Sequence, residues 1–462
     1  MSERPPSPAV SLTWQLSEAV PLSVTADAIL RQRLAALSAI GFLLGYYAMH
    51  NQWVQVVWVG LWTAAWFWEG GFQEFLESLR QDRWFAAVAG MMLLMLARSS
   101  LLESPGLTMQ MLWRGWLGVG LLSVVLMTLW SVGRQPRALV WLGVPMVGVA
   151  ALAALGSILV FYMLETEAVF GVRLRNWFIY GGWNSVCTGM TFGFAAVWAS
   201  YAWNKSQVRE EKLIWLAAAV TLIMATLLTM SRGAIFALVM AHAVWILTLG
   251  WRAALKPLML LIGCITFFQV SAPVISSLAA QDVSEKLGIA ASDVTDEMLA
   301  DGVVAANPAA RAFERSDNGR FAIYAAAFSS MTTWQDWLFG KGLWSENDFW
   351  SCSLDWYPEH LHSIFMDAFV RGGLLGLAGL LLIIGWALRR AFLLARAGEE
   401  LWLVLASFGI TGLVFDGDSA FSLLTLPRFE TLLLWVPLVI ASARYQIVER
   451  LRNDFAKSAI TA

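Results

Sequence analysis

The chain has 462 residues, of which 58% are hydrophobic and only 14% are charged. A soluble domain usually carries about 25% charged residues, so the composition argues against a water-soluble globular fold and favours the bilayer as solvent. The net charge of −2 gives no support to a nucleic-acid partner. The 26 Trp and 26 Phe residues fit many membrane spans, because aromatic rings concentrate at membrane interfaces.

The apolar stretches predict an all-α polytopic membrane protein with about twelve transmembrane helices. A helix needs about 20 apolar residues to cross the hydrocarbon core. Residues 1–30 precede the first stretch and are expected to form a cytoplasmic tail. The candidate spans are 34–50, 51–68, 84–102, 112–132, 138–164, 184–203, 213–230, 233–250, 256–275, 361–388, 400–415 and 430–447. Spans 1–9 therefore occupy 31–275, a long loop follows over 276–360, spans 10–12 occupy 361–447, and 448–462 form a second cytoplasmic tail.

Lys and Arg set the orientation of these spans. If the N-terminus is cytoplasmic, every short inside loop is basic, and most of the 31 basic residues fall on that side. Short outer segments should then avoid Arg, and those that keep it need a reason. Snorkelling is sufficient for Arg98 and Arg114, which flank span ends.

Three outer arginines are harder to explain in this way, namely Arg173, Arg175 and Arg232. Arg232 stands in Ser231-Arg232-Gly233-Ala234 with no polar loop around it. A guanidinium at the end of two apolar helices is costly without an anionic partner. Arg173 and Arg175 have an alternative role as interface anchors. Arg371 lies inside the tenth span beside Gly372-Gly373, where we expect a kink or break, and it is either a salt-bridged structural charge or a donor-site residue.

The loop over 276–360 is the only long polar insert, and we expect it to form a lid over a cavity among the helices. After Arg320, which has acidic Asp317 and Glu314 as alternative partners, apolar residues recur at helical spacing and predict an amphipathic helix lying on the membrane or on the bundle. These residues are Phe321, Tyr324, Phe328 and Met331. Gly340-Lys341-Gly342 can cradle a phosphate, but a plain tight turn is favoured.

A histidine pair, His360 and His362, stands where this loop meets the tenth span. A metal site would need three or four ligands, and no His-x3-His or Cys-rich spacing is present, so a metal is not favoured. Either imidazole suits a general base. His242, inside an apolar run, is expected to be a hydrogen-bonded core residue. Asp416-Gly417-Asp418 has the Asp-x-Asp form of metal-dependent sugar transferases, but an acidic turn is favoured.

Three motifs, in order and on the same face, resemble those of the O-antigen ligase and polymerase superfamily. His362-Ser363, followed after nine residues by Gly373-Leu374-Leu375-Gly376, resembles its histidine motif. Ser231-Arg232-Gly233-Ala234 looks like its arginine motif. Gly319-Arg320 and the later Trp337-Leu338-Phe339-Gly340-Lys341-Gly342 are similar to the stretch before the histidine in many members. The resemblance covers about 170–380. Tyr180-Gly181-Gly182-Trp183-Asn184-Ser185 lacks the His-Pro or Asn-Pro element of many ligases.

The resemblance implies a GT-C-like glycosyltransferase in the bacterial inner membrane. Such an enzyme moves a preassembled glycan from undecaprenyl diphosphate to a sugar hydroxyl of lipid A-core at the periplasmic face, with inversion and with neither a metal nor a cofactor. In this interpretation His362 is the base. The donor diphosphate is held by Arg232, Arg173, Arg175 and Arg320, and the accessory candidates are His360, Arg371 and Asp416.

Three other functions stay open at the level of sequence. An O-antigen or exopolysaccharide polymerase shares the donor chemistry but uses another lipid-linked repeat as acceptor. A protein O-glycosyltransferase of the same superfamily is a further alternative. A secondary transporter would be a different class, and it predicts inverted repeats and charges near the midplane. The sequence shows no convincing internal repeat, and its unusual charges cluster at one face.

Overall fold

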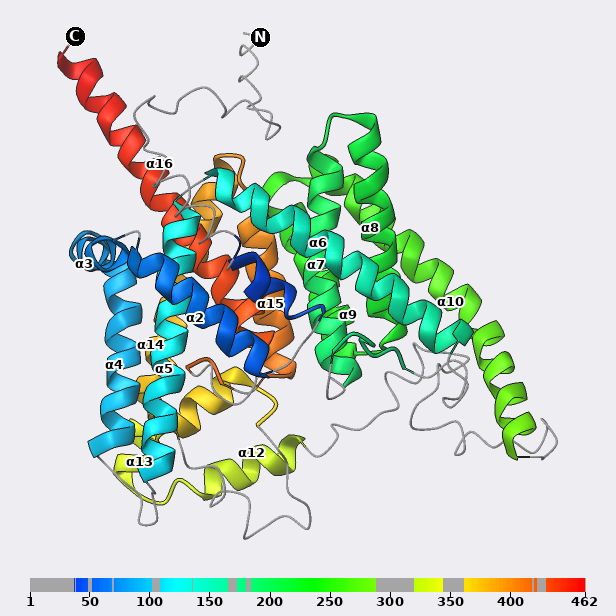
Figure 1. The fold of residues 1–462 in the computed structure, drawn as a ribbon, viewed down its shortest axis with the longest axis horizontal. Helices are drawn as coiled ribbons and strands as arrows, with labels where there is room; N and C mark the ends of the chain where they lie inside the picture. Colours follow the sequence, from blue (N-terminus) through cyan, green and yellow to red (C-terminus); the bar gives the residue numbers. More distant parts are fainter. Residues whose placement is uncertain are drawn as a thin grey trace.

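The structure is a computed structural model, and its description covers most of the chain. The described residues are 37, 39–48, 52–68, 70–101, 109–134, 136–164, 173–179, 184–287, 320–343, 361–417, 419–421 and 429–461. Over these ranges the fold is helical and contains no strand. Figure 1 shows most of the long helices running side by side, with α12 and α13 across one end of the bundle and α16 projecting from the other.

The helices follow one another with short connections in the N-terminal half. They are α2 (Gln52–Trp68), α3 (Gly71–Gln81), α4 (Arg83–Leu101), α5 (Met109–Gly133), α6 (Pro136–Leu159) with a π-helical end η2 (Val160–Leu164), α7 (Ser185–Lys205), α8 (Arg209–Leu228), α9 (Arg232–Leu249) and α10 (Trp251–Leu287). Helix α10 runs past residue 275, where the sequence places the end of the ninth span, because Pro273 lies inside the helix without ending it.

The C-terminal half carries the elements that frame the candidate site. Two short helices come first, α12 (Arg320–Ser329) and α13 (Trp334–Phe339). The long helix α14 (Ile364–Arg396), α15 (Leu401–Phe415), the π-helical turn η4 (Thr431–Trp435) and α16 (Val436–Thr461) follow. Helix α14 contains the break expected at its glycine pair, since Gly373 has φ 63° and ψ −161° inside it.

Seven helices of the described residues are long and apolar enough to cross a membrane, by length and composition. They belong to α5, α6, α8, α9, α10, α14 and the η4–α16 segment, and α15 is a shorter apolar helix. The chain is therefore a multi-pass membrane protein. The twelve spans expected from the sequence stay a prediction. Helix α7 shows why apolar length alone misses some of them, since it carries Thr188, Thr191 and Ser200 as buried residues and needs no lipid-facing surface there.

Helix α7 lies at the centre of the packing, where small residues let its neighbours approach closely. It begins at Asn184, whose side chain accepts hydrogen bonds from the backbone N–H groups of Val186 and Cys187. A Cβ on Gly189 would lie 2.6 Å from Thr229 Oγ1, and one on Gly193 would lie 2.6 Å from a ring carbon of Phe408. Larger residues at these two positions would push α8 and α15 away from the core.

Two short helices were not expected from the sequence. Helix α3 has Phe72, Phe75, Leu76 and Leu79 at helical spacing, a signal hidden inside a segment assigned to a cytoplasmic loop. Helix α13 begins with a capping box between Thr333 and Asp336. The amphipathic helix predicted after Arg320 is present as α12. Its apolar face differs from the prediction, however, since Ile323 and Ala327 are buried and Phe321 is 75% exposed.

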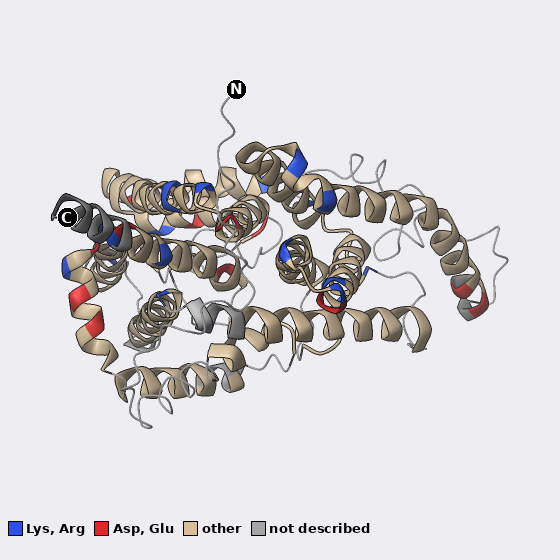
Figure 2. Cartoon of the chain, turned by 90° about the horizontal axis from the view of Figure 1, so that it is seen from above, with Lys and Arg blue, Asp and Glu red and all other residues tan. Residues whose placement is uncertain are grey.

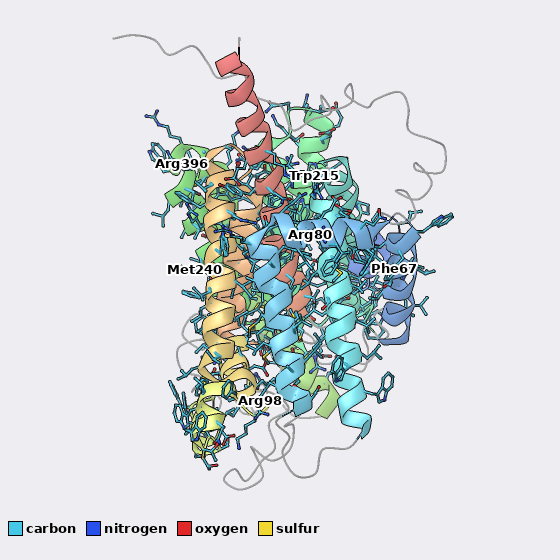
Figure 3. All side chains as sticks on the ribbon, turned by 90° about the vertical axis from the view of Figure 1, so that its left-hand side faces the viewer. Phe67, Arg80, Arg98, Trp215, Met240 and Arg396 are labelled. Atoms are coloured by element: carbon cyan, nitrogen blue, oxygen red, sulfur yellow. The ribbon has the colours of Figure 1, made fainter. Side chains whose placement is uncertain are left out.

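Ion pairs tie the helices together at the end of the bundle that the sequence assigns to the cytoplasm. The pairs are Arg134–Glu74, Lys205–Glu400, Arg390–Asp82 and Arg444–Glu399. Seen from above, most of the ribbon carries no charge, and the charged residues gather near helix ends (Figure 2). Figure 3 shows Arg80 and Arg396 toward the end from which α16 emerges and Arg98 at the opposite end. The arginines discussed below thus include a group far from the ion-paired end.

Candidate active site

The turn between α8 and α9 presents Arg232 at the first position of a helix. Met230 takes a left-handed backbone conformation with φ 50°, which reverses the chain. Ser231 then caps α9, because its hydroxyl accepts a hydrogen bond from the backbone N–H of Ala234 at 3.4 Å. Arg232 is half-buried. Helix N-termini favour anions, since their N–H groups are unpaired and the helix dipole is positive there.

A short extended segment before α7 packs along this turn and brings Arg173 to it. The backbone N–H of Leu174 donates to the carbonyl of Leu228 at 3.0 Å. Arg173 Nε donates to the carbonyl of Thr229 at 2.9 Å, three residues before Arg232. Leu174 is buried and Arg175 is exposed. Of the two arginines in this segment, Arg173 is therefore the one held against the arginine turn.

His362 is paired with a carboxylate from another helix. Its Nδ1 lies 3.1 Å from Asp416 Oδ1, and the Asp416 side chain is only 7% exposed. Asp416 terminates α15, where its N–H donates to the carbonyl of Gly412 at 3.0 Å. His362 has φ 53° and immediately precedes Ser363, the N-cap of α14. A carboxylate on Nδ1 fixes the ring orientation and leaves Nε2 to face a reactant.

Packing between α9 and α15 brings the arginine turn and the histidine to the same end of the bundle. A Cβ on Gly233 would lie 3.5 Å from Phe415 Cβ, and Phe415 directly precedes Asp416. The rings of Phe236 and Phe415 meet edge to face with centroids 5.6 Å apart. The residue after Arg232 therefore abuts the residue before Asp416.

Helix α12 adds two residues to this group. Arg320 and Tyr324 are one turn apart, and Tyr324 is hydrogen-bonded to the side chain of Ser363. Half-burial raises the pKa of the Tyr324 phenol, whereas the positive charge of Arg320 and the bond with Ser363 act in the opposite direction. The charge of Asp416 also acts on Tyr324, which places α12 beside the His362–Asp416 pair. Tyr324 was expected only as part of an apolar stripe.

Residues 217–381 match the family model described as O-antigen ligase. The chain belongs to the O-antigen ligase and polymerase superfamily. The matched segment runs from α8 to the middle of α14 and contains Arg232, Arg320 and His362. A comparison with curated proteins finds no match. Members of this superfamily are membrane enzymes that process lipid-linked glycans, and this chain is one of them.

Arg173 and Asp416 lie outside the segment that matches the O-antigen ligase family. Their place at the site follows from the structure alone, through the contacts with Thr229 and His362. No local sequence signal identified Asp416 as the partner of His362, because 54 residues separate them. The alternation of Arg173 and Arg175 also gave no direction until the pairing of Leu174 with α8 was known.

The remaining candidate residues fall into different places. Arg371 forms an ion pair with Asp367 one turn before it in α14 and donates to the carbonyl of Leu343, so it acts as a salt-bridged structural charge. His242 is buried, with Nδ1 2.8 Å from the carbonyl of Leu238, as expected of a core residue. His360 lies outside the described residues. Among those described, no group of three or more His, Cys, Asp and Glu side chains could hold a metal ion.

Proposed function

We propose that this chain is an O-antigen ligase, which transfers a preassembled glycan from undecaprenyl diphosphate to a sugar hydroxyl of lipid A-core. One observation carries the proposal. The packing of α9 on α15 brings a helix-terminal arginine and a carboxylate-paired histidine to the same end of the bundle. Such a site has positive charge for a diphosphate beside a base for a hydroxyl. The family match supports lipid-linked glycan transfer at the coarser level.

The proposed setting is the bacterial inner membrane, with the N-terminus in the cytoplasm and the site facing the periplasm. The support comes from the basic inside loops and from the ion-paired end that carries them. A lipid-linked donor reaches a membrane site without any soluble nucleotide sugar. We further propose twelve spans, with the long loop before α14 acting as a lid, since α12 already lies over Ser363.

Arg232 and Arg173 are proposed as the main ligands of the donor diphosphate. Guanidinium groups bind phosphate oxygens in pairs and keep their charge at any physiological pH. Arg232 adds the positive end of α9, and Arg320 lies one helical turn from Tyr324 on the lid side. Arg175 belongs to the same proposed group but is exposed, which gives it a lesser role. These charges would stabilise the negative charge that develops on the leaving diphosphate.

His362 is proposed as the general base and Asp416 as the residue that orients it. The imidazole takes the proton of the acceptor hydroxyl, and the hydroxyl oxygen forms a bond to the anomeric carbon. The bond from that carbon to the phosphate oxygen breaks at the same time, and undecaprenyl diphosphate leaves with the electron pair. A single displacement of this kind inverts the anomeric configuration. The arginines supply the positive charge, so the proposed step needs no metal or cofactor.

Reconstitution in liposomes tests the function. The purified protein is given undecaprenyl-diphosphate-linked glycan and lipid A-core, and the product is separated by size. We expect glycan-capped core from the wild type and none from Arg232→Ala or His362→Ala. His242→Gln is the matched control, because His242 is a histidine of the same chain bonded only to its own helix in the contacts found here.

The acceptor separates ligase from polymerase. Transfer to lipid A-core supports the ligase, whereas joining of two lipid-linked repeats with no transfer to core would replace it with the polymerase. Full activity of both Arg232→Ala and His362→Ala would overturn the proposed site. Movement of a solute across the liposome membrane without any glycan transfer would favour the transporter class instead.

A further inference from the structure

A tight turn of the long loop is seated in the break of α14. The turn consists of Gly340, Lys341 and Gly342 and follows α13 directly. The backbone N–H of Lys341 donates to the carbonyl of Val370 at 2.8 Å, and that of Gly342 donates to the carbonyl of Arg371 at 2.9 Å. These two carbonyls are available because the helix ladder of α14 is interrupted at Gly373. The turn therefore takes the place of the missing helical turn.

Two glycines make this contact possible, one on each side. Gly340 has φ 71°, and a Cβ there would lie 2.3 Å from the carbonyl carbon of Arg371. Gly373 has φ 63°, and a Cβ there would lie 2.4 Å from the carbonyl carbon of Leu338. Both positions combine a left-handed backbone with a backbone-to-backbone approach that no side chain fits. The fit is therefore specific to this pair of segments.

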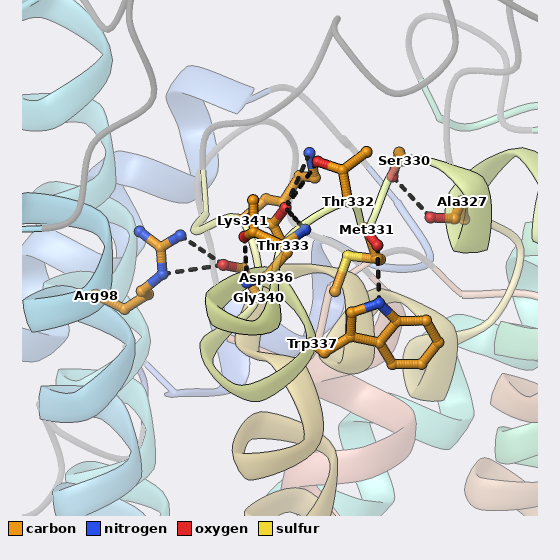
Figure 4. Close-up of polar contacts among 10 residues, drawn as sticks. All are labelled: Arg98, Ala327, Ser330, Met331, Thr332, Thr333, Asp336, Trp337, Gly340 and Lys341. Atoms are coloured by element: carbon orange, nitrogen blue, oxygen red, sulfur yellow. Dashed lines mark hydrogen bonds and ion pairs between the residues drawn. The ribbon is translucent and has the colours of Figure 1, made fainter.

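Helix α4 clamps the turn from its outer side (Figure 4). Arg98 donates from both Nε and Nη2 to the carbonyl of Gly340. The next residue, Ser99, accepts a hydrogen bond on its Oγ from the backbone N–H of Leu343 at 3.0 Å. Arg98 and Ser99 thus bind both ends of a turn that is 242 residues away in the chain. Snorkelling does not account for Arg98, since its guanidinium ends on the protein backbone.

The clamped turn supports the half of α14 that begins at the histidine. The N–H of Asp367 donates to the carbonyl of Ser363 at 2.9 Å, and Asp367 is ion-paired with Arg371 at the break. One short helix, Ile364 to Gly372, therefore runs from the residue after Ser363 to the seated turn. A shift at the turn is transmitted along this rigid piece to His362.

The other contacts of this half-helix are with the loop rather than with the bundle. A small apolar cluster, separate from the main core, joins it to α12 and the segment after it, with Ile323, Ala327, Met331, Leu361, Phe369 and Val370 as members. Trp337 of α13 packs edge to face on Phe369 at 5.5 Å. Arg98 and Ser99 are the polar link from this loop assembly to α4 and so to the main bundle.

We propose that Arg98 is a positioning residue for glycan transfer, which acts through the Gly340–Gly342 turn to hold His362 against Asp416. The proposal rests on the proposed function of His362 as the base. Arg98 contacts neither reactant. Its loss should leave the donor arginines in place but let the half-helix of α14 move. Small displacements of a reacting group lower the rate steeply, whereas binding that depends on other residues changes little.

The test measures kcat and the donor KM of the full chain in liposomes with lipid-linked glycan and lipid A-core. For Arg98→Ala we expect kcat to fall about 10- to 100-fold with the donor KM changed less than about twofold. Arg98→Lys keeps one donor for the Gly340 carbonyl and should recover part of the loss. Ser99→Ala removes the second contact and should give a smaller fall. Ser100→Ala is the matched control, because Ser100 Oγ bonds Trp116 and no part of the turn.

Three results would overturn the positioning role. They are a kcat of Arg98→Ala within about twofold of wild type, a loss that appears mainly in the donor KM, and an equal loss in Ser100→Ala. Arg98→Lys and Ser99→Ala keep the test decisive if Arg98→Ala does not fold. Failure of the proposed function looks different, since His362→Ala would then stay active. With His362→Ala inactive and Arg98→Ala fully active, only the positioning role fails.

Discussion

The imidazole of His362 and the carboxylate of Asp416 lie 3.1 Å apart, although one begins α14 and the other ends α15. The contact couples the start of one helix to the end of the next, and Gly417 secures it. A Cβ on Gly417 would lie 2.7 Å from Ile364 Cγ2, so the backbone after Asp416 is pressed against the first residue of α14. The orientation of the proposed base therefore depends on two helix ends at once.

Replacement of Asp416 by Asn tests whether its charge serves the base. The amide keeps the size of the side chain but no longer stabilises a protonated imidazole, and it can hold the ring in the wrong tautomer. We expect kcat to fall about 100-fold, in the range that general-base catalysis contributes, with the donor KM little changed. Glycan transfer in liposomes measures both values. Glu449→Gln, on the distant α16, is the control, and equal kinetics of the two variants would contradict the prediction.

Arg173 and Arg175 should differ in their effect on the donor. Arg173 is bound at the arginine turn and Arg175 is exposed, so Arg173→Ala should raise the donor KM about 10-fold or more. For Arg175→Ala we expect a change below about threefold, as for a screened surface charge. Titration of the lipid-linked donor gives the two KM values. A larger effect of Arg175→Ala would assign the donor contact to the wrong arginine.

Two glycines of α14 should respond to alanine in opposite directions. Gly373→Ala forces a side chain into a backbone region that is nearly exclusive to glycine and against Leu338, so we expect at least about 1–3 kcal/mol of destabilisation. A Cβ on Gly385 meets no atom within 4 Å, and alanine there should stabilise the helix by up to about 1 kcal/mol. Thermal unfolding in detergent compares the two. A higher melting temperature for Gly373→Ala would mean that the break is not needed.

The ion pair of Asp82 and Arg390 should matter more for stability than the exposed pairs near it. Both side chains are less than a tenth exposed, and Arg390 also lies over the ring of Trp386. Asp82→Asn keeps the acceptor for the N–H groups at the start of α4 but leaves Arg390 buried without its counter-charge, at a cost of about 3–5 kcal/mol.

Glu74→Gln is the matched control for Asp82→Asn. Glu74 pairs with Arg134 at a site where both side chains are a quarter to a third exposed. Water and salt screen such a pair, so its loss should cost less than about 1 kcal/mol. Unfolding by denaturant in detergent measures both variants. Similar losses for the two would show that burial does not amplify the Asp82 pair.

Tyr324 should make stability depend on alkaline pH. Because half-burial raises its pKa in the folded protein, the neutral phenol is favoured by folding. Its contribution is fully present below the unfolded pKa of about 10 and is lost as the pH rises through the higher folded value. The wild type should therefore lose stability relative to Tyr324→Phe above about pH 10 and show a constant difference between pH 7 and 9. Melting temperatures over this range would contradict the prediction if the difference grew below pH 9.

The sequence predicted the helical class, the break in α14 and the core role of His242, because each depends on local pattern. Gly372-Gly373 announces a break wherever the chain goes afterwards. The partner of Arg98 could not be predicted in the same way, since its contact with Gly340 spans 242 residues. The buried face of α12 was also missed, because the large Phe321 and Phe328 suggested a stripe while the smaller Ile323 and Ala327 fit the narrow contact with α14.

Met230 and His362 are the two non-glycine residues with a left-handed backbone in the described part of the chain. Each directly precedes the serine that caps a helix, one at the arginine motif and one at the histidine motif. Such a conformation costs about 1–2 kcal/mol per residue, and glycine or asparagine relieves it. A library selected for thermostability alone should therefore enrich Gly or Asn at both positions. At position 362 the gain would come with the loss of the proposed base, so stability and activity are opposed there, whereas at position 230 an engineer can seek both.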